Sequence, residues 1–143
     1  MADTSAGFKY RYRLCGQPPH VQELVAGTAI TFYKGDMLIA TGGSVFLSTV
    51  GSTTNLGACQ ETVAATAGTT MISFISDDDA VYGVYDASAR VMGATLDLSA
   101  TGGAMTVTTS GSKDFIVVAT KNAAADETLV KFNTGHHLFN TAQ

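Results

Sequence analysis

Short β-favouring runs separated by turn residues recur along most of this sequence, and they constrain the fold more than any other feature. Val, Ile, Thr and aromatic residues are frequent in these runs, whereas helical periodicity is nearly absent. Such spacing is typical of a β-sandwich or β-barrel. Strands are predicted over residues 21–25, 29–33, 37–40, 45–49, 58–63, 71–75, 81–85, 94–98, 105–108, 115–120 and 129–133.

Glycine-containing turns separate the predicted strands, because glycine adopts positive φ at little cost. Turns are expected at residues 34–36, 42–43, 67–68, 101–103 and 110–111, with 34–36 as a hairpin turn. A helical turn over residues 86–91, with Asp86 as its N-cap, is the one helical element predicted.

The chain length of 143 residues fits one domain with one core. We therefore predict an all-β fold, a single compact β-barrel or β-sandwich of jelly-roll or tulip-like type. Residues 1–20 differ in pattern from the rest and are expected to form an extended N-terminal arm. Residues 21–143 then make up the β domain.

Charged residues are scarce, at 14% of the chain against about 25% in an ordinary soluble domain. A charge-poor surface is easily desolvated and suits protein interfaces, although strand propensity alone also explains the many threonines. The net charge of −4 disfavours nucleic acid and anionic membranes as partners. With no apolar run of about 20 residues and no signal segment, we expect a soluble protein made in the cytoplasm.

The segment from residue 8 to residue 14 alternates strictly between apolar and basic side chains. As a strand it would present one apolar face and one basic face. Three interpretations stay open: strand addition to a neighbouring protein, contact with single-stranded nucleic acid, or an ordinary first strand of the domain's own sheet. We favour protein contact over nucleic acid. The predicted protein-interface residues are Phe8, Lys9, Tyr10, Arg11, Tyr12, Arg13 and Leu14.

Residue patterns for catalysis or cofactor binding are missing, so we expect a non-enzymatic protein without catalytic, cofactor-binding or metal-binding residues. His20, His136 and His137 could act as a catalytic base, but the sequence has no G-x-S-x-G motif to supply the nucleophile. His136 and His137 are adjacent and would point to opposite faces of a strand, so surface histidines are the expectation, with a shared site on an oligomer axis as the alternative.

Other polar motifs are equally unspecific. Residues 77–79 are three aspartates that lack the frame of a calcium loop, so a solvated turn is expected. Gly42 and Gly43 lack the remaining residues of a phosphate-binding loop. Cys15 and Cys59 have neither CxxC nor zinc spacing and are expected to be free thiols.

Three stretches resemble β-barrel structural proteins of tailed bacteriophages. They are residues 32–38, residues 56–70 with the sequence LGACQETVAATAGTT, and residues 71–85, in which a strand closes on acidic residues and an aromatic strand follows. Residues 91–98 and the strand at Phe115 are similar in order and spacing. Asp79 stands where a proline follows the acidic pair in those proteins, and the arm is not covered.

The resemblance implies a virion protein, a decoration or cement protein on the outside of an icosahedral capsid. Its implied partner is the major capsid protein, and we expect a homotrimer at local threefold positions. The alternatives are another phage module, associated with the tail or a fibre, and a carbohydrate-binding β-sandwich. The latter should expose aromatic side chains on one face, and the sequence contains no Trp.

Overall fold

The computed structural model describes residues 7–85, 90–99, 102–103, 105–109, 111–122 and 127–138, and its strands form two packed β-sheets. The predicted all-β class is confirmed, and the architecture is a β-sandwich. The strands are β1 (Lys9–Arg13), β2 (Val21–Ala26), β3 (Thr31–Phe32), β4 (Met37–Thr41), β5 (Ser44–Leu47), β6 (Asn55–Ala58), β7 (Val63–Ala64), β8 (Met71–Ile75), β9 (Ala80–Tyr85), β10 (Thr95–Ser99), β11 (Thr106–Thr108), β12 (Phe115–Asn122) and β13 (Glu127–Phe132).

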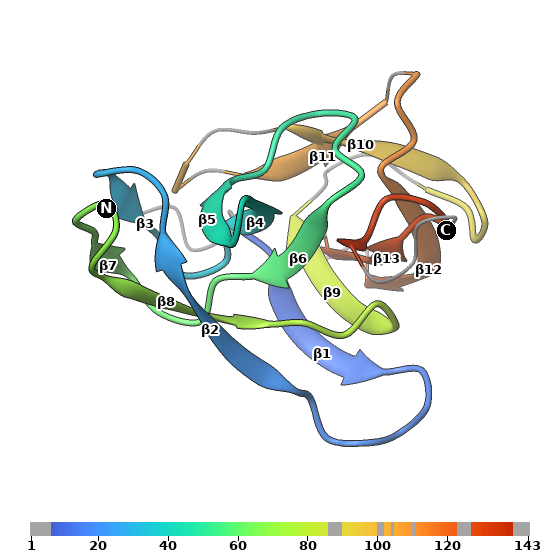
Figure 1. Cartoon of the computed structure of the whole chain (residues 1–143). Helices are drawn as coiled ribbons and strands as arrows, with labels where there is room; N and C mark the ends of the chain where they lie inside the picture. The colour runs from blue at the N-terminus through green and yellow to red at the C-terminus, as the bar shows by residue number, and fades with distance from the viewer. Residues whose placement is uncertain are drawn as a thin grey trace.

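One sheet has six strands in the order β1-β9-β13-β12-β10-β11, and the other has five in the order β6-β4-β5-β2-β8 (Figure 1). Strands β3 and β7 form a separate two-stranded sheet. Strand β2 runs parallel to β5, whereas the other ladders in these sheets are antiparallel. Within the described part of the chain, no helix is long and apolar enough to cross a membrane.

The outer strands of the five-stranded sheet approach each other, so this sheet is strongly curled. Cys59, just after β6, forms a bridge with Phe74 of β8, and the Gln60 amide donates to the Ser73 carbonyl at 3.0 Å. In the six-stranded sheet, the chain before β1 meets the chain before β11, since the Gly7 amide donates to the Met105 carbonyl at 2.8 Å. These contacts cover parts of the sheet edges, which limits pairing with foreign strands.

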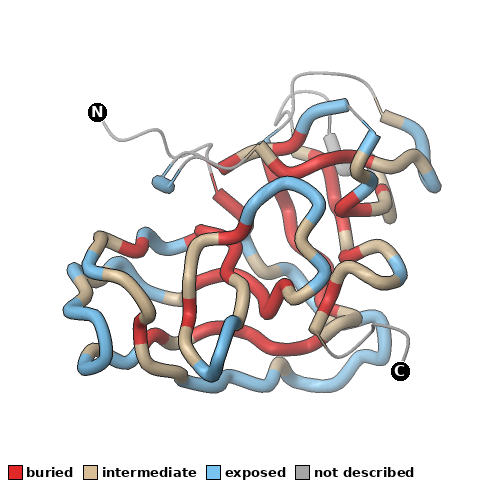
Figure 2. Tube along the Cα trace, turned by 45° about the horizontal axis from the view of Figure 1, so that its top comes forward, coloured by how far each residue is buried: buried red, intermediate tan, exposed pale blue. Residues whose placement is uncertain are grey.

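Two groups of buried side chains form the core. The buried segments of the chain are red in Figure 2. The larger lies mainly on the inner face of the six-stranded sheet, where the Phe8 and Phe115 rings are 5.1 Å apart and the Phe115 and Phe132 rings 5.5 Å apart. The smaller lies within the curled five-stranded sheet and contains Phe32 and Phe74. Each buried aromatic or aliphatic side chain contributes about 1.5–3 kcal/mol, so this packing is the main source of stability.

The connections between the strands confirm one predicted turn and differ from other predictions. Gly42 and Gly43 join β4 to β5 as a two-residue hairpin with φ of 59° and 81°, as a type I′ turn requires. Residues 34–36 instead connect β3 to β4, which belong to different sheets, so they do not form the expected hairpin. The strand predicted over 58–63 is wrong, because β6 ends at Ala58 and β7 begins at Val63. In the predicted helical turn 86–91, residues 86–89 lie outside the described residues.

Candidate interaction surface

Residues 9–13 of the predicted arm form an integral strand of the domain. Strand β1 pairs antiparallel with β9, with Lys9 opposite Gly83 and Arg13 opposite Ala80. Phe8 is buried and belongs to the larger core cluster. The expectation of an extended arm is therefore corrected for this segment, because its apolar face packs on the domain's own core. Residues 1–6 lie outside the described residues.

A β-bulge in β1 changes which side chains face outward. Tyr10 lies opposite Tyr82 but Tyr12 lies opposite Val81, so Arg11 is an additional residue without a partner in the register. A bulge reverses the inside–outside alternation beyond it. Tyr10 therefore packs against the core, whereas Tyr12 and Leu14 are exposed, with relative exposures of 42% and 51%. The predicted single apolar face of residues 8–14 is wrong after residue 10.

The two arginines of β1 are held by carboxylates. Arg11 forms a two-pronged contact with Glu127 on β13, with Nε to Oε1 at 2.9 Å and Nη2 to Oε2 at 2.5 Å. Arg13 donates from Nε to Asp79 Oδ1 at 2.8 Å, and its Nη1 lies 3.5 Å from Asp77 Oδ1. The predicted basic face is thus largely neutralised within the chain. This weakens the nucleic-acid interpretation, because phosphate binding needs available cations.

Asp77 and Asp79 anchor the connection between β1 and β2, which we name the β1–β2 loop (residues 14–20). Asp79 accepts hydrogen bonds from the Cys15 amide at 3.2 Å and from Arg13, while Asp77 accepts from the His20 amide at 2.8 Å. Partial burial alone would raise the pKa of Asp79, but the hydrogen bonds from Arg13 and Cys15 outweigh it and lower that pKa. The expected solvated turn at 77–79 is corrected, since Asp77 is buried.

The two adjacent histidines connect the chain after β13 to the chain around β6 through hydrogen bonds. His137 is fully buried and its Nε2 donates to the Leu56 carbonyl at 2.7 Å. His136 Nδ1 lies 3.2 Å from Asp114 Oδ1, and the His136 carbonyl accepts from Asn55 Nδ2 at 2.7 Å. The expectation of surface histidines is therefore wrong for His137. Burial lowers the pKa of His137, partly opposed by its bond to Leu56 and by the charges of Asp78 and Asp77.

Three further buried aspartates stabilise turns by accepting backbone hydrogen bonds. Asp36 accepts from the Tyr33 and Gly103 amides, Asp97 from the Ser112 and Lys113 amides, and Asp114 from the Gly51 and Leu98 amides. Burial raises the pKa of Asp36, against the lowering effect of these amides. The sequence predicted a turn at Asp36 and a strand at Asp97, and hydropathy did not indicate that any of the three aspartates is buried.

The described side chains offer little for metal chemistry. Among them, no group of three or more His, Cys, Asp or Glu residues is arranged to hold a metal ion. Cys15 is exposed, Cys59 is buried, and both are free thiols. What the described surface does offer is exposed apolar side chains, among them Leu14, Val21, Val91 and Met92.

No model of a protein family matches the chain, and no curated protein matches it.

Proposed function

We propose that this chain is a non-enzymatic virion structural protein that binds the outer surface of an icosahedral phage capsid and stabilises it by bridging coat subunits. The partner is the major capsid protein, and the protein acts as a homotrimer on the capsid exterior. The proposal draws on the resemblance of residues 32–38, 56–70 and 71–85 to phage β-barrel proteins, and on the character of the surface.

The proposal is supported mainly by the charged side chains that are buried or paired within the chain. Asp36, Asp77, Asp97 and Asp114 are buried, so four of the nine acidic residues that the structure describes are withdrawn from the surface into backbone hydrogen bonds. Arg11 and Arg13 are bound to carboxylates. The surface is therefore poorer in available charge than the composition indicates. Contact with several protein neighbours at once costs less desolvation on such a surface.

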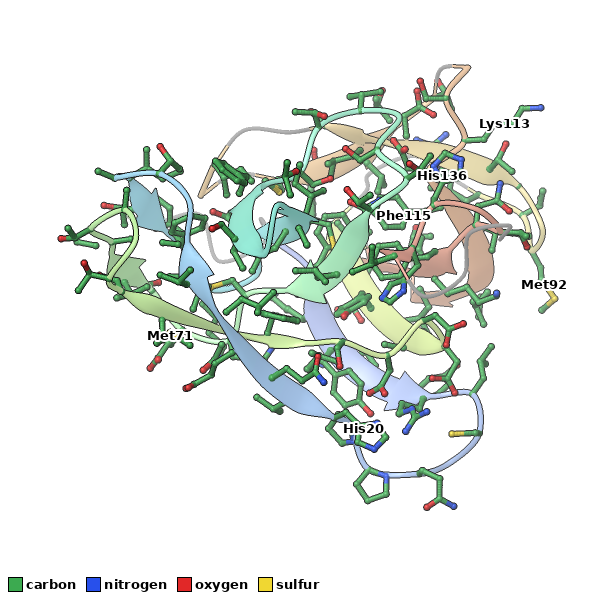
Figure 3. The ribbon with its side chains drawn as sticks, in the orientation of Figure 1. His20, Met71, Met92, Lys113, Phe115 and His136 are labelled. Carbon is green, nitrogen blue, oxygen red and sulfur yellow. The ribbon has the colours of Figure 1, made fainter. Side chains whose placement is uncertain are left out.

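Exposed apolar side chains lie at separate extremities of the molecule. Met71 at the start of β8, Met92 in the turn before β10, and the chain around His20 lie at different edges in Figure 3. Val91 and Met92 are 72% and 76% exposed. Single exposed apolar residues are common, but apolar residues at several edges suit a protein that bridges more than one neighbour.

Binding to undecorated capsids tests the proposal. The purified chain is first sedimented to determine its mass, and a trimer is expected. It is then mixed with capsids assembled without it, pelleted, and imaged by electron microscopy. Added density at regular positions on the capsid exterior supports the proposal. A monodisperse monomer that stays in the supernatant contradicts it, and density confined to a tail or fibre assigns the chain to another part of the virion.

A further inference from the structure

The segment after β13, residues 136–138, lies along one edge of β6, and we name it the C-terminal strap. His137 forms a parallel bridge with Asn55, the first residue of β6. Asn55 Nδ2 donates to the His136 carbonyl at 2.7 Å, and His137 Nε2 donates to the Leu56 carbonyl at 2.7 Å. The strap therefore continues the five-stranded sheet beyond its outermost strand.

Strand β6 is an edge strand, and the strap covers part of its outer side. It pairs with β4 on its inner side. On the outer side, β8 approaches the later residues of β6: a Cβ atom at Gly57 would lie 1.7 Å from the Ile75 carbonyl oxygen, and Cys59 forms a bridge with Phe74. The strap covers the earlier half. An uncovered edge presents backbone groups that can pair with a strand of another chain.

The strap is short, and it follows an anchored turn. The Asn133 amide donates to the Asp114 carbonyl at 3.0 Å, and Asn133 Nδ2 donates to the Lys113 carbonyl at 3.1 Å. Beyond this turn, Leu138 packs against the smaller core cluster. A short segment near a chain end has low local stability, so the strap can open while β13 stays folded.

Acid favours the open strap through His137. Its ring is fully buried and lies 4.9 Å from the Phe132 ring. A charged imidazolium here would lose its hydration, and the Leu56 carbonyl with the carboxylates of Asp78 and Asp77 offsets only part of that cost. Burial accordingly lowers the pKa of His137. The ring binds a proton more tightly once the strap has left its site.

His136 responds to acid in the opposite direction. Its Nδ1 atom lies 3.2 Å from Asp114 Oδ1 and 3.2 Å from the Ser52 carbonyl oxygen, and its side chain is 17% exposed. Protonation of His136 would strengthen the contact with Asp114 and hold the strap closed. Ion pairs with access to solvent contribute little, whereas a poorly compensated buried charge is costly. His137 therefore determines the direction of the net effect.

From this arrangement we propose that the C-terminal strap is an acid-sensitive latch on the edge of β6. At neutral pH His137 is uncharged, and the strap closes the edge. As the pH falls below about 6.5, the strap detaches from Asn55 and Leu56, and the earlier half of β6 becomes available for pairing with a strand of another chain. The latch does not depend on the proposed capsid function.

Hydrogen exchange of the intact chain, read by NMR at pH 7.5 and pH 5.5 and corrected for intrinsic exchange rates, tests the latch. Protection of residues 136–138 should fall about three- to tenfold at pH 5.5. Opening of the strap alone exposes little surface, so this exchange should hardly change in dilute urea, whereas exchange of the β13 amides should rise. Unchanged protection at pH 5.5 overturns the latch. Equal urea dependence in the strap and β13 would assign the opening to global unfolding and also overturn it.

Two variants separate the histidines. His137→Gln keeps a side-chain donor for the Leu56 carbonyl but does not titrate, so its strap should have equal protection at both pH values. His136→Gln is the matched control: it retains His137, and its strap should lose at least as much protection as the wild type. A full pH response in His137→Gln, or none in His136→Gln, contradicts the proposal. If His137→Gln does not fold, the His136→Gln response and the urea dependence of the wild type still decide.

Discussion

Arg11 and Glu127 are joined across an intervening strand. They belong to β1 and β13, and β9 runs between these strands. Gly83 of β9 lies beneath the pair, and a Cβ atom at this position would be 2.3 Å from Glu127 Oε1. Because Gly83 has no side chain, the Arg11 and Glu127 side chains can make contact above it. The ion pair thus links β1 to β13 across β9.

The contribution of this pair to stability is expected to be small. Its side chains are 35% and 12% exposed, and pairs open to solvent are screened. A double-mutant cycle with Arg11→Gln and Glu127→Gln should give a coupling of about 0.2–1 kcal/mol in urea unfolding. The coupling should decrease in 1 M NaCl. Arg11→Gln combined with Glu61→Gln, an exposed residue near β7, should show additive effects.

Gly57 should tolerate substitution far less than Gly83. A Cβ atom at Gly57 would lie 1.7 Å from the Ile75 carbonyl oxygen, which is backbone of β8, and φ there is 156°. Gly57→Ala should therefore separate β6 from β8 and cost about 3 kcal/mol or more, or prevent folding. Gly83→Ala meets only the movable ends of Arg11 and Glu127 and should cost about 1 kcal/mol. Equal Tm values for the two variants would contradict this contact.

Acid should destabilise the protein through His137. Burial lowers its pKa, so the unfolded chain binds this proton more tightly than the folded protein does. Its stabilising contribution is complete above the unfolded pKa of about 6.5 and is lost as the pH falls from there through the lower folded pKa. The slope reaches at most about 1.4 kcal/mol per pH unit.

Urea unfolding at pH 7.5 and pH 5.5 measures this loss. His137→Gln removes the titrating group, so the variant should lose less stability between the two pH values than the wild type does. His20 and His136 are present in both proteins, so they do not contribute to the difference between them. Equal losses in both proteins would exclude His137 as the source of acid sensitivity.

The two cysteines should differ sharply in reactivity. Cys15 is exposed on the β1–β2 loop, whereas Cys59 is buried and burial raises its pKa, which disfavours the reactive thiolate. A maleimide reagent should label one thiol per chain quickly in native buffer and the second only in denaturant. Cys15→Ser should abolish the fast phase, and rapid labelling of Cys59 in that variant would show that the region between β6 and β8 opens readily.

Strand positions were largely predictable because alternating β-branched residues and glycine turns are local signals. The predicted strands at 21–25, 71–75 and 81–85 correspond closely to β2, β8 and β9. The division of 58–63 into the ends of β6 and β7 was not predictable, because it depends on which sheet each half joins. Local sequence does not encode that choice.

The surface was predictable only in part. The alternation of residues 8–14 indicated a strand, but it did not indicate the bulge at Arg11, whose side chain pairs with the distant Glu127. Hydropathy assigns Asp77, Asp114 and His137 to the surface, whereas backbone partners far along the chain allow their burial. The assignment of Tyr12 and Leu14 to a protein interface stays a prediction.

The strand order also fixes when the protein can finish folding on the ribosome. Arg13 of β1 pairs with Ala80 of β9, and β9 pairs in turn with β13. At about 5–20 residues per second, β1 is synthesised roughly 3–13 s before β9. During that interval Phe8 and Tyr10 have no sheet to pack on, so the nascent chain should bind chaperones or aggregate most readily at its first strand.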